Sequence, residues 1–239
     1  MNESNRLPIH YAELEAVFAR TLGNGSRALA LASAVGGEGV TTLARALAER
    51  AAASGKRTLL IDLNLDHPEL HHLYAVDRCD WSPDRNHGTE AVRPTSSDGL
   101  SVLSAPLHTA DHWAFRDSTS LHASLVHWLQ SFDCVVADTS PLTRRNRQNI
   151  PADAVCGAFR DTLLVVLAAR TPESQLLEAR QMLDASGARI KGAVMNDRYL
   201  PGLSSELVRE THRFDRLLPR TMAWARQWIT ASALLKQPI

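Results

Sequence analysis

A glycine-rich stretch, Ser33 to Thr42, carries the clearest chemistry in the sequence, and it reads Ser-Ala-Val-Gly-Gly-Glu-Gly-Val-Thr-Thr. Glycines let backbone N–H groups converge on an anion without Cβ clashes, and a helix N-terminus adds partial positive charge. The apolar residues before this stretch predict a strand, and those after it predict a helix, which is the context that a phosphate-binding loop requires. We therefore predict that this P-loop binds nucleotide through Gly36, Gly37, Glu38, Gly39, Val40, Thr41 and Thr42.

The P-loop departs from the usual pattern, Gly-x-x-x-x-Gly-Lys-[Ser/Thr], at two positions. Val40 stands in the lysine position and Ala34 in that of the first glycine. The lysine normally reaches the β- and γ-phosphates, and the following hydroxyl binds Mg²⁺. Thr41 keeps that hydroxyl and is predicted to contact the metal, so the sequence predicts a loop that holds phosphate without its catalytic cation.

Two further predicted strands end in aspartate. Asp62 follows Leu59-Leu-Ile, and Asp138 follows Val135-Val-Ala. Because the carboxyl ends of parallel strands line the ligand edge of an open α/β sheet, both are candidate catalytic residues. Asp62 is predicted to orient a water molecule, with a cap or turn as the alternative. Asp138 is predicted to bind Mg²⁺ near the γ-phosphate.

Three other polar residues fall at this predicted edge. Asn196 ends the last predicted strand, where its amide would bind an adenine edge or form a turn. Arg144 and Arg145 belong to a short basic cluster after Asp138. A solvated turn is one reading of that cluster, and contact with phosphate in place of the missing lysine is the other.

Composition limits the classes of function. The chain has 239 residues, 44% of them hydrophobic, which is enough for one substantial core, so we expect a single domain over residues 1–239. Its 26 basic and 26 acidic residues balance, so no nucleic-acid partner is expected. No signal peptide and no apolar run of roughly 18 to 20 residues is present, which predicts a cytoplasmic protein.

The order of predicted elements indicates an α/β fold with a doubly wound, mostly parallel sheet. An amphipathic helix is expected over about residues 11–22 and another over 113–130. The polar residues 77–98 are expected to form a surface insertion. Helices are expected over about residues 203–236, where Trp224 and Trp228 lie one turn apart and would contact either the core or a partner or lipid surface.

Taken together, the motifs resemble the ParA/MinD branch of P-loop ATPases, which have the P-loop NTPase fold of the SIMIBI type. They are most similar to the cytoplasmic domain of the bacterial tyrosine kinases that govern capsule and exopolysaccharide export. The resemblance rests on Ser33 to Thr42, Leu59 to Pro68 and Phe132 to Pro141, with Gly99 to Leu103 and Gly192 to Asn196 in support. It implies ATP or ADP with Mg²⁺, and a homodimer with nucleotide between the subunits. It also implies a membrane polysaccharide co-polymerase or export protein as partner, and hence recruitment to the inner face of the plasma membrane.

Departures from the family pattern decide among the functional hypotheses. Besides Val40, Asn64 replaces a second carboxylate and Asp66 stands where the kinases have arginine, and the tyrosine-rich C-terminal tail is absent. The first hypothesis is a degenerate, nucleotide-binding regulator with weak or no ATP hydrolysis and no autophosphorylation of a tail. The alternatives are an active ATPase or kinase that uses an arginine in place of the lysine, and an interaction scaffold that needs no nucleotide.

Overall fold

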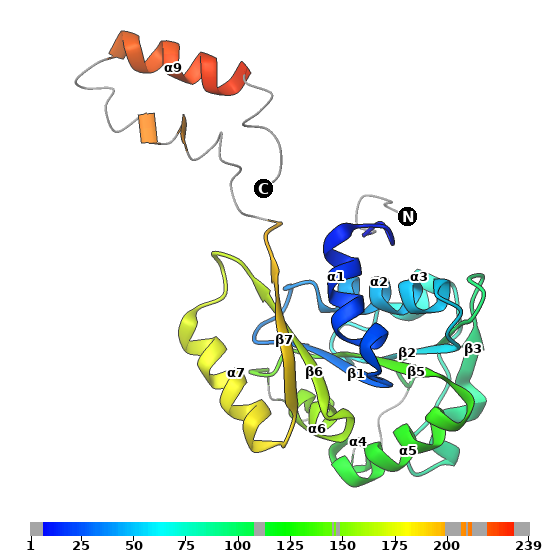
Figure 1. Cartoon of the computed structure of the whole chain (residues 1–239). Coiled ribbons are helices and arrows are strands. Elements are labelled where there is room, and N and C mark those ends of the chain that lie inside the picture. The colour runs from blue at the N-terminus through cyan, green and yellow to red at the C-terminus, as the bar shows by residue number, and fades with distance from the viewer. Residues whose placement is uncertain are drawn as a thin grey trace. The chain divides into compact units, whose positions relative to one another are not determined.

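The computed structural model describes residues 7–107, 113–144, 146, 149–198, 207–208, 210–211 and 219–231. Sequence analysis predicted one domain, whereas the chain forms two compact units, Met1–Asn196 and Asp197–Ile239 (Figure 1). All the predicted nucleotide-site residues fall in the first unit, so the site is a property of that unit.

The first unit is built on a seven-stranded sheet in the order β3-β4-β2-β5-β1-β6-β7. All neighbouring strands are parallel except the pair β3 and β4, which is antiparallel. The doubly wound, mostly parallel α/β fold predicted from the sequence is thereby confirmed. The strands are β1 (Ala28–Ser33), β2 (Thr58–Leu63), β3 (Val92–Pro94), β4 (Leu100–Leu103), β5 (Cys134–Thr139), β6 (Asp161–Leu167) and β7 (Arg189–Asn196).

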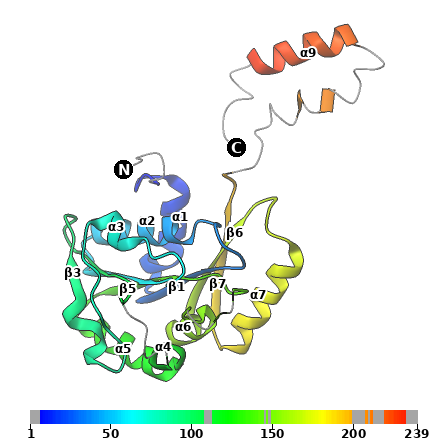
Figure 2. The ribbon, with the colours of Figure 1, turned by 180° about the vertical axis from the view of Figure 1, so that it is seen from behind.

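Helices cover both faces of the sheet, which explains why its central strands are apolar on both sides (Figures 1 and 2). Alternate residues of β2 enter different cores: Leu59 and Ile61 join one cluster, and Leu60 joins the other. α1 (Ala12–Arg20), α2 (Val40–Ala53) and α3 (Leu70–Tyr74) lie on the second cluster. The first is covered by α4 (Trp113–Arg116), α5 (Ser118–Ser131), α6 (Ala152–Phe159) and α7 (Glu173–Ala185).

The predicted surface insertion at residues 77–98 is in fact part of the packed fold. It contains the short helix η3 (Asn86–Ala91) and the edge strand β3. Trp81 is buried, and its indole N–H donates to the carbonyl oxygen of Ser104 at 2.8 Å. The Trp81 ring also meets Phe115 and Trp128 edge to face. The polar composition of residues 77–98 predicts an exposed loop. The single buried side chain of Trp81 gives no periodic pattern that would indicate otherwise.

Two predicted helices are interrupted or shortened. The expected helix at residues 113–130 is divided into α4 and α5 by Asp117, whose carboxylate accepts hydrogen bonds from the backbone N–H groups of Thr119 and Ser120. The helix expected at about residues 11–22 ends at Arg20 and is followed by the short helix η2 (Leu22–Asn24). Capping by Asp117 therefore sets the boundary between α4 and α5, which hydrophobic spacing alone does not resolve.

The second unit contains α9 (Pro219–Ala231), which lies within the helical region expected at residues 203–236. Residues 207–208 and 210–211 are also helical, and the rest of that region lies outside the described residues. Trp224 and Trp228 are exposed, whereas Ile229 on the same helix is buried. Within the part of the chain that the structure describes, no helix is long and apolar enough to cross a membrane.

Candidate nucleotide-binding site

The P-loop connects β1 to α2 and has the backbone conformation of an anion-binding turn. Gly37 and Gly39 have φ angles of 82° and 99°, a region that favours glycine. A Cβ atom at Gly39 would lie 2.7 Å from the Nδ2 atom of Asn196, so a larger residue here would also displace the Asn196 amide. Because α2 begins at Val40, the N–H groups of its first turn lack intrahelical acceptors and suit a phosphate.

The Glu38 side chain braces the loop from behind. The side chain is fully buried, and its carboxylate accepts hydrogen bonds from the backbone N–H of Val35 at 3.1 Å and of Leu167 at 3.2 Å. The hydroxyl of Thr171 donates to the same carboxylate. Glu38 was predicted to bind nucleotide, and this supporting role was not predicted, because Leu167 and Thr171 belong to the end of β6 and the turn beyond it.

The Val40 side chain points into the protein core. It is 7% exposed and belongs to the hydrophobic cluster beneath α2, together with Leu43 and Leu47. Thr41 and Thr42, also predicted to bind nucleotide, are partly exposed. At the lysine position, this chain therefore has a core side chain, and only the backbone of Val40 remains available to a phosphate.

Asp62 and Asp138 are neighbours in register on β2 and β5, as expected for two strand-end carboxylates. Asp62 is buried and accepts three backbone hydrogen bonds, from Asn64 at 3.1 Å, Glu69 at 3.1 Å and Leu70 at 3.2 Å. Burial raises the pKa of Asp62 above its ordinary value, although these N–H donors oppose the rise. Its contacts match the cap-and-turn alternative, since they hold the start of α3.

Asp138 differs from Asp62 in having no such partners. Its side chain is 1% exposed, and neither carboxylate oxygen has a hydrogen-bond partner among the described residues. Burial, and then the Asp62 carboxylate, raise the pKa of Asp138 well above its ordinary value, while the Thr41 hydroxyl opposes the rise. A buried acceptor without a donor fits a cation ligand, so Thr41 and Asp138 are suited to hold Mg²⁺ bound to a nucleotide.

Asn196 lies at the end of β7, where its side-chain amide donates to the carbonyl oxygen of Glu38 at 2.9 Å. Contact with an adenine edge was one predicted role and a turn was the other. The observed bond joins the last strand of the sheet to the P-loop, and contact with an adenine edge stays a prediction.

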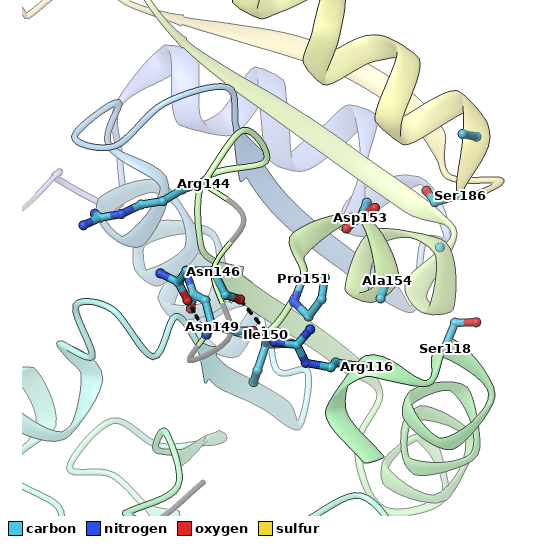
Figure 3. A pocket seen from close by; sticks show the side chains of 12 residues that line it. Arg116, Ser118, Arg144, Asn146, Asn149, Ile150, Pro151, Asp153, Ala154 and Ser186 are labelled. Atoms are coloured by element: carbon cyan, nitrogen blue, oxygen red, sulfur yellow. Dashed lines mark hydrogen bonds between the residues drawn. The ribbon is translucent and has the colours of Figure 1, made fainter. Parts of the chain in front are cut away.

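Arg144 does not form any described contact with the P-loop. Its Nε atom pairs with the Asp66 carboxylate at 3.1 Å, and Asn149 donates to the same oxygen at 2.9 Å. Arg144 also lines a pocket of about 510 Å³ beside α6, where its side chain extends away from Arg116 (Figure 3). Arg145, the other predicted phosphate contact, lies outside the described residues.

The segment after β5 also holds the P-loop in place through two hydrogen bonds, which were not predicted from the sequence. The backbone N–H of Leu142 donates to the carbonyl oxygen of Ser33 at 2.9 Å. The hydroxyl of Thr143 donates to the carbonyl oxygen of Ala34 at 2.7 Å. No local pattern marks Thr143 for this contact, because its partner is 109 residues away in the sequence.

The chain is similar in sequence to known bacterial proteins. No protein-family model matches the chain. Tyrosine-protein kinase YwqD of Bacillus subtilis (strain 168) is 24% identical over 178 residues, which cover 73% of this chain and 73% of the relative. A putative tyrosine-protein kinase CapB of Staphylococcus aureus is 22% identical over 177 residues, covering 72% of this chain and 76% of the relative.

Solved structures share the fold at low sequence identity. The chimerical protein CapA2B2 superposes with a TM-score of 0.67 and 18% identity, covering 81% of this chain and 87% of that chain. The cell division ATPase MinD of Pyrococcus furiosus superposes with a TM-score of 0.58 and 22% identity, covering 77% of this chain and 80% of that chain. Cobyrinic acid a,c-diamide synthase of Mycobacterium smegmatis, with bound ADP and magnesium, superposes with a TM-score of 0.59 and 20% identity, covering 72% of this chain and 76% of that chain. The chain thus has the fold of MinD-like P-loop ATPases and is similar in sequence to bacterial tyrosine-protein kinases, which confirms the resemblance seen in its motifs.

Proposed function

We propose that this chain is a nucleotide-binding regulatory protein with a degenerate P-loop and weak or no ATP hydrolysis. The observation that carries the proposal is the burial of Val40 at the lysine position of a loop whose phosphate-binding backbone is otherwise held in place. Gly37, Gly39 and the buried carboxylate of Asp138 support ATP or ADP with Mg²⁺ as the ligand.

Weak turnover follows from what the missing cation does. A lysine aimed at the transferring phosphoryl group stabilises charge that develops in the transition state, and loss of one such donor typically costs about 10² to 10³ in rate. Asp62, the second predicted catalytic residue, has both oxygens engaged by backbone N–H groups of its own segment. Binding depends more on the loop backbone, which this chain keeps.

The biological setting is proposed from the family likeness. Kinases similar to this chain suggest a role in producing or exporting an exopolysaccharide or capsule, with a membrane co-polymerase or export protein as partner. The same likeness suggests a homodimer and a location at the cytoplasmic face of the plasma membrane. These assignments rest on analogy and not on a site in the chain.

Thermal melting with and without Mg²⁺-ATP and Mg²⁺-ADP tests the binding proposal. Ligand at 100 times its Kd adds about 2.7 kcal/mol to the free energy of unfolding, so the melting temperature of the wild type should rise by several degrees. Gly37→Asp should abolish this rise, because its carboxylate would repel phosphate from the loop.

Gly55→Asp is a matched control for the glycine replacement. Gly37 and Gly55 have φ angles of 82° and 85°, and neither has an atom within 4 Å of an added Cβ. Gly55 follows the other end of α2, so its replacement should lower the melting temperature similarly but leave the nucleotide-dependent rise intact. If the wild type shows no rise at saturating nucleotide, the chain is an interaction scaffold and the proposal is wrong.

Hydrolysis is tested by phosphate release from the wild type and Val40→Lys. A low rate in both proteins is expected if Asp62 serves only as a cap. A large gain in the variant would show an active site that lacks only its lysine, whereas rapid hydrolysis by the wild type would contradict the regulatory assignment.

A further inference from the structure

Asp66 follows β2 and connects its own segment to the segment between β5 and α6. Its Oδ2 atom accepts a hydrogen bond from the Asn149 amide at 2.9 Å and lies 3.1 Å from the Nε atom of Arg144. Its Oδ1 atom accepts a hydrogen bond from the Asn146 amide at 3.3 Å. The Asp66 side chain is only 12% exposed, so these partners take the place of water. One carboxylate thus joins two segments that leave the sheet at the same edge.

The segment between β5 and α6 is also attached to the P-loop. Thr143 donates twice to the carbonyl oxygen of Ala34, from its hydroxyl at 2.7 Å and from its backbone N–H at 3.2 Å. Ala34 lies at the start of the P-loop, and β5, which leads into the segment, carries Asp138. The contacts of Asp66 are therefore connected to the nucleotide site through Thr143.

Further hydrogen bonds hold the described part of this segment between its two attachments. The side-chain oxygen of Asn146 accepts the backbone N–H of Asn149 at 2.7 Å (Figure 3). Arg116 of α4 donates to the carbonyl oxygens of the same two asparagines at 3.1 and 3.4 Å. The Ser140 hydroxyl donates to the carbonyl oxygen of Ile150 at 3.0 Å, which joins the two ends of the segment. A segment bonded in this way transmits a displacement at one attachment to the other.

We infer that Asp66 is a positioning residue for nucleotide binding, which acts on the P-loop through Thr143. The inference rests on the proposed function and adds a residue that influences the same site without touching the nucleotide. The Ala34 carbonyl precedes the glycines whose N–H groups converge on a phosphate, so a shift of Thr143 changes the direction of those groups. Loss of the Asp66 contacts therefore lowers affinity for nucleotide as well as stability.

Calorimetric titration of the full chain with Mg²⁺-ADP tests this assignment. Asp66→Asn keeps the size of the side chain but removes its charge and one of its acceptor oxygens. We expect ADP to bind at least about fivefold more weakly, which corresponds to the loss of one hydrogen bond. Thr143→Val should also weaken binding. The double variant should lose less than the product of the two single losses, because both replacements act through the same segment.

Asp133→Asn is the matched control. The Asp133 carboxylate also accepts three hydrogen bonds, all from Arg57, and it also joins the flanks of β2 and β5, but at the opposite edge of the sheet. Its replacement should lower stability and leave the affinity for ADP unchanged. A role of Asp66 in stability alone predicts the same unchanged affinity for Asp66→Asn, so the titration separates the two roles.

Wild-type affinity for ADP in Asp66→Asn would overturn the inference and leave the proposed function standing. Absence of nucleotide binding in the wild type would overturn both. An equal loss of affinity in Asp133→Asn would contradict the inference, since affinity would then follow overall stability, and fully multiplicative losses in the double variant would exclude the route through Thr143. If Asp66→Asn does not fold, Thr143→Val still decides, because unchanged affinity in that variant contradicts the inference.

Discussion

Asp62 and Asp138 sit side by side on β2 and β5, but their surroundings differ sharply. The Asp62 carboxylate accepts N–H groups from the segment that leads into α3. The Asp138 carboxylate is equally buried and accepts no hydrogen bond from the described residues. The same residue type, at the same edge and depth, is thus fully satisfied on one strand and unsatisfied on the next.

The difference separates a structural carboxylate from a ligand-binding one. A buried, unpartnered carboxylate destabilises the folded state, so its presence is best explained by a group that binds there. A carboxylate that caps its own following segment stabilises the fold whether or not nucleotide is present. We therefore propose Asp138 as the metal ligand, and Asp62 is the weaker candidate for catalysis.

Replacement of Asp62 should give the largest effect on stability. Asp62→Asn keeps the size of the side chain but replaces one acceptor oxygen with a donor, although both oxygens accept backbone N–H groups. We expect the free energy of unfolding to fall by about 2 kcal/mol, because buried donors are left without acceptors. Urea unfolding without nucleotide or Mg²⁺ measures this, and a loss below about 0.5 kcal/mol would remove the contrast between the two aspartates.

The same replacement at Asp138 should act in the opposite direction. Asp138→Asn removes a buried charge that, unlike that of Asp62, accepts no backbone N–H, and it also removes repulsion from Asp62. We expect the free energy of unfolding to rise by about 1 kcal/mol at neutral pH, while Mg²⁺-dependent nucleotide binding is weakened. Destabilisation by Asp138→Asn in the same urea experiment would mean that Asp138, like Asp62, serves the fold.

The stability difference between Asp138→Asn and the wild type should also change with pH, by less than the effects above. This pH dependence shows whether burial of the Asp138 charge causes the difference. Because burial raises the pKa of Asp138 in the folded protein, the contribution of this carboxyl group to stability is fully present below its ordinary pKa, about 4. That stability is lost as pH rises toward the folded pKa. The advantage of Asp138→Asn over the wild type should therefore be smallest near pH 4 and grow as pH increases.

Asp133 provides a control, because its pKa is shifted in the opposite direction to that of Asp138 and stability should respond to pH in the opposite way. The Arg57 guanidinium and backbone N–H lower the pKa of the exposed Asp133 to about 2. Its contribution is present above the ordinary pKa and lost as pH falls toward 2. Asp133→Asn should therefore differ from the wild type mainly at higher pH and in the destabilising direction. Parallel trends in the two variants would show that global charge, not local burial, sets the response.

Much of the fold could be predicted because its signals are local. The apolar runs that end in Asp62 and Asp138 indicated buried parallel strands, and the glycine pattern indicated the turn between β1 and α2. The segment at residues 77–98 was misjudged because its anchor is the single side chain of Trp81, whose partner Ser104 lies 23 residues further on. A pattern within a short window does not contain such a contact.

The sequence by itself determined the chemistry that the ligand edge offers: a glycine loop without lysine, two strand-end carboxylates and a threonine hydroxyl. Residue types and their spacing along single strands suffice for that, since period and turn chemistry are short-range properties. Tertiary structure alone decided how the side chains are used. It placed Val40 in the core, joined Glu38 to Thr171 and directed Arg144 to Asp66. These outcomes depend on which distant segments pack together, and packing is a property of the whole fold.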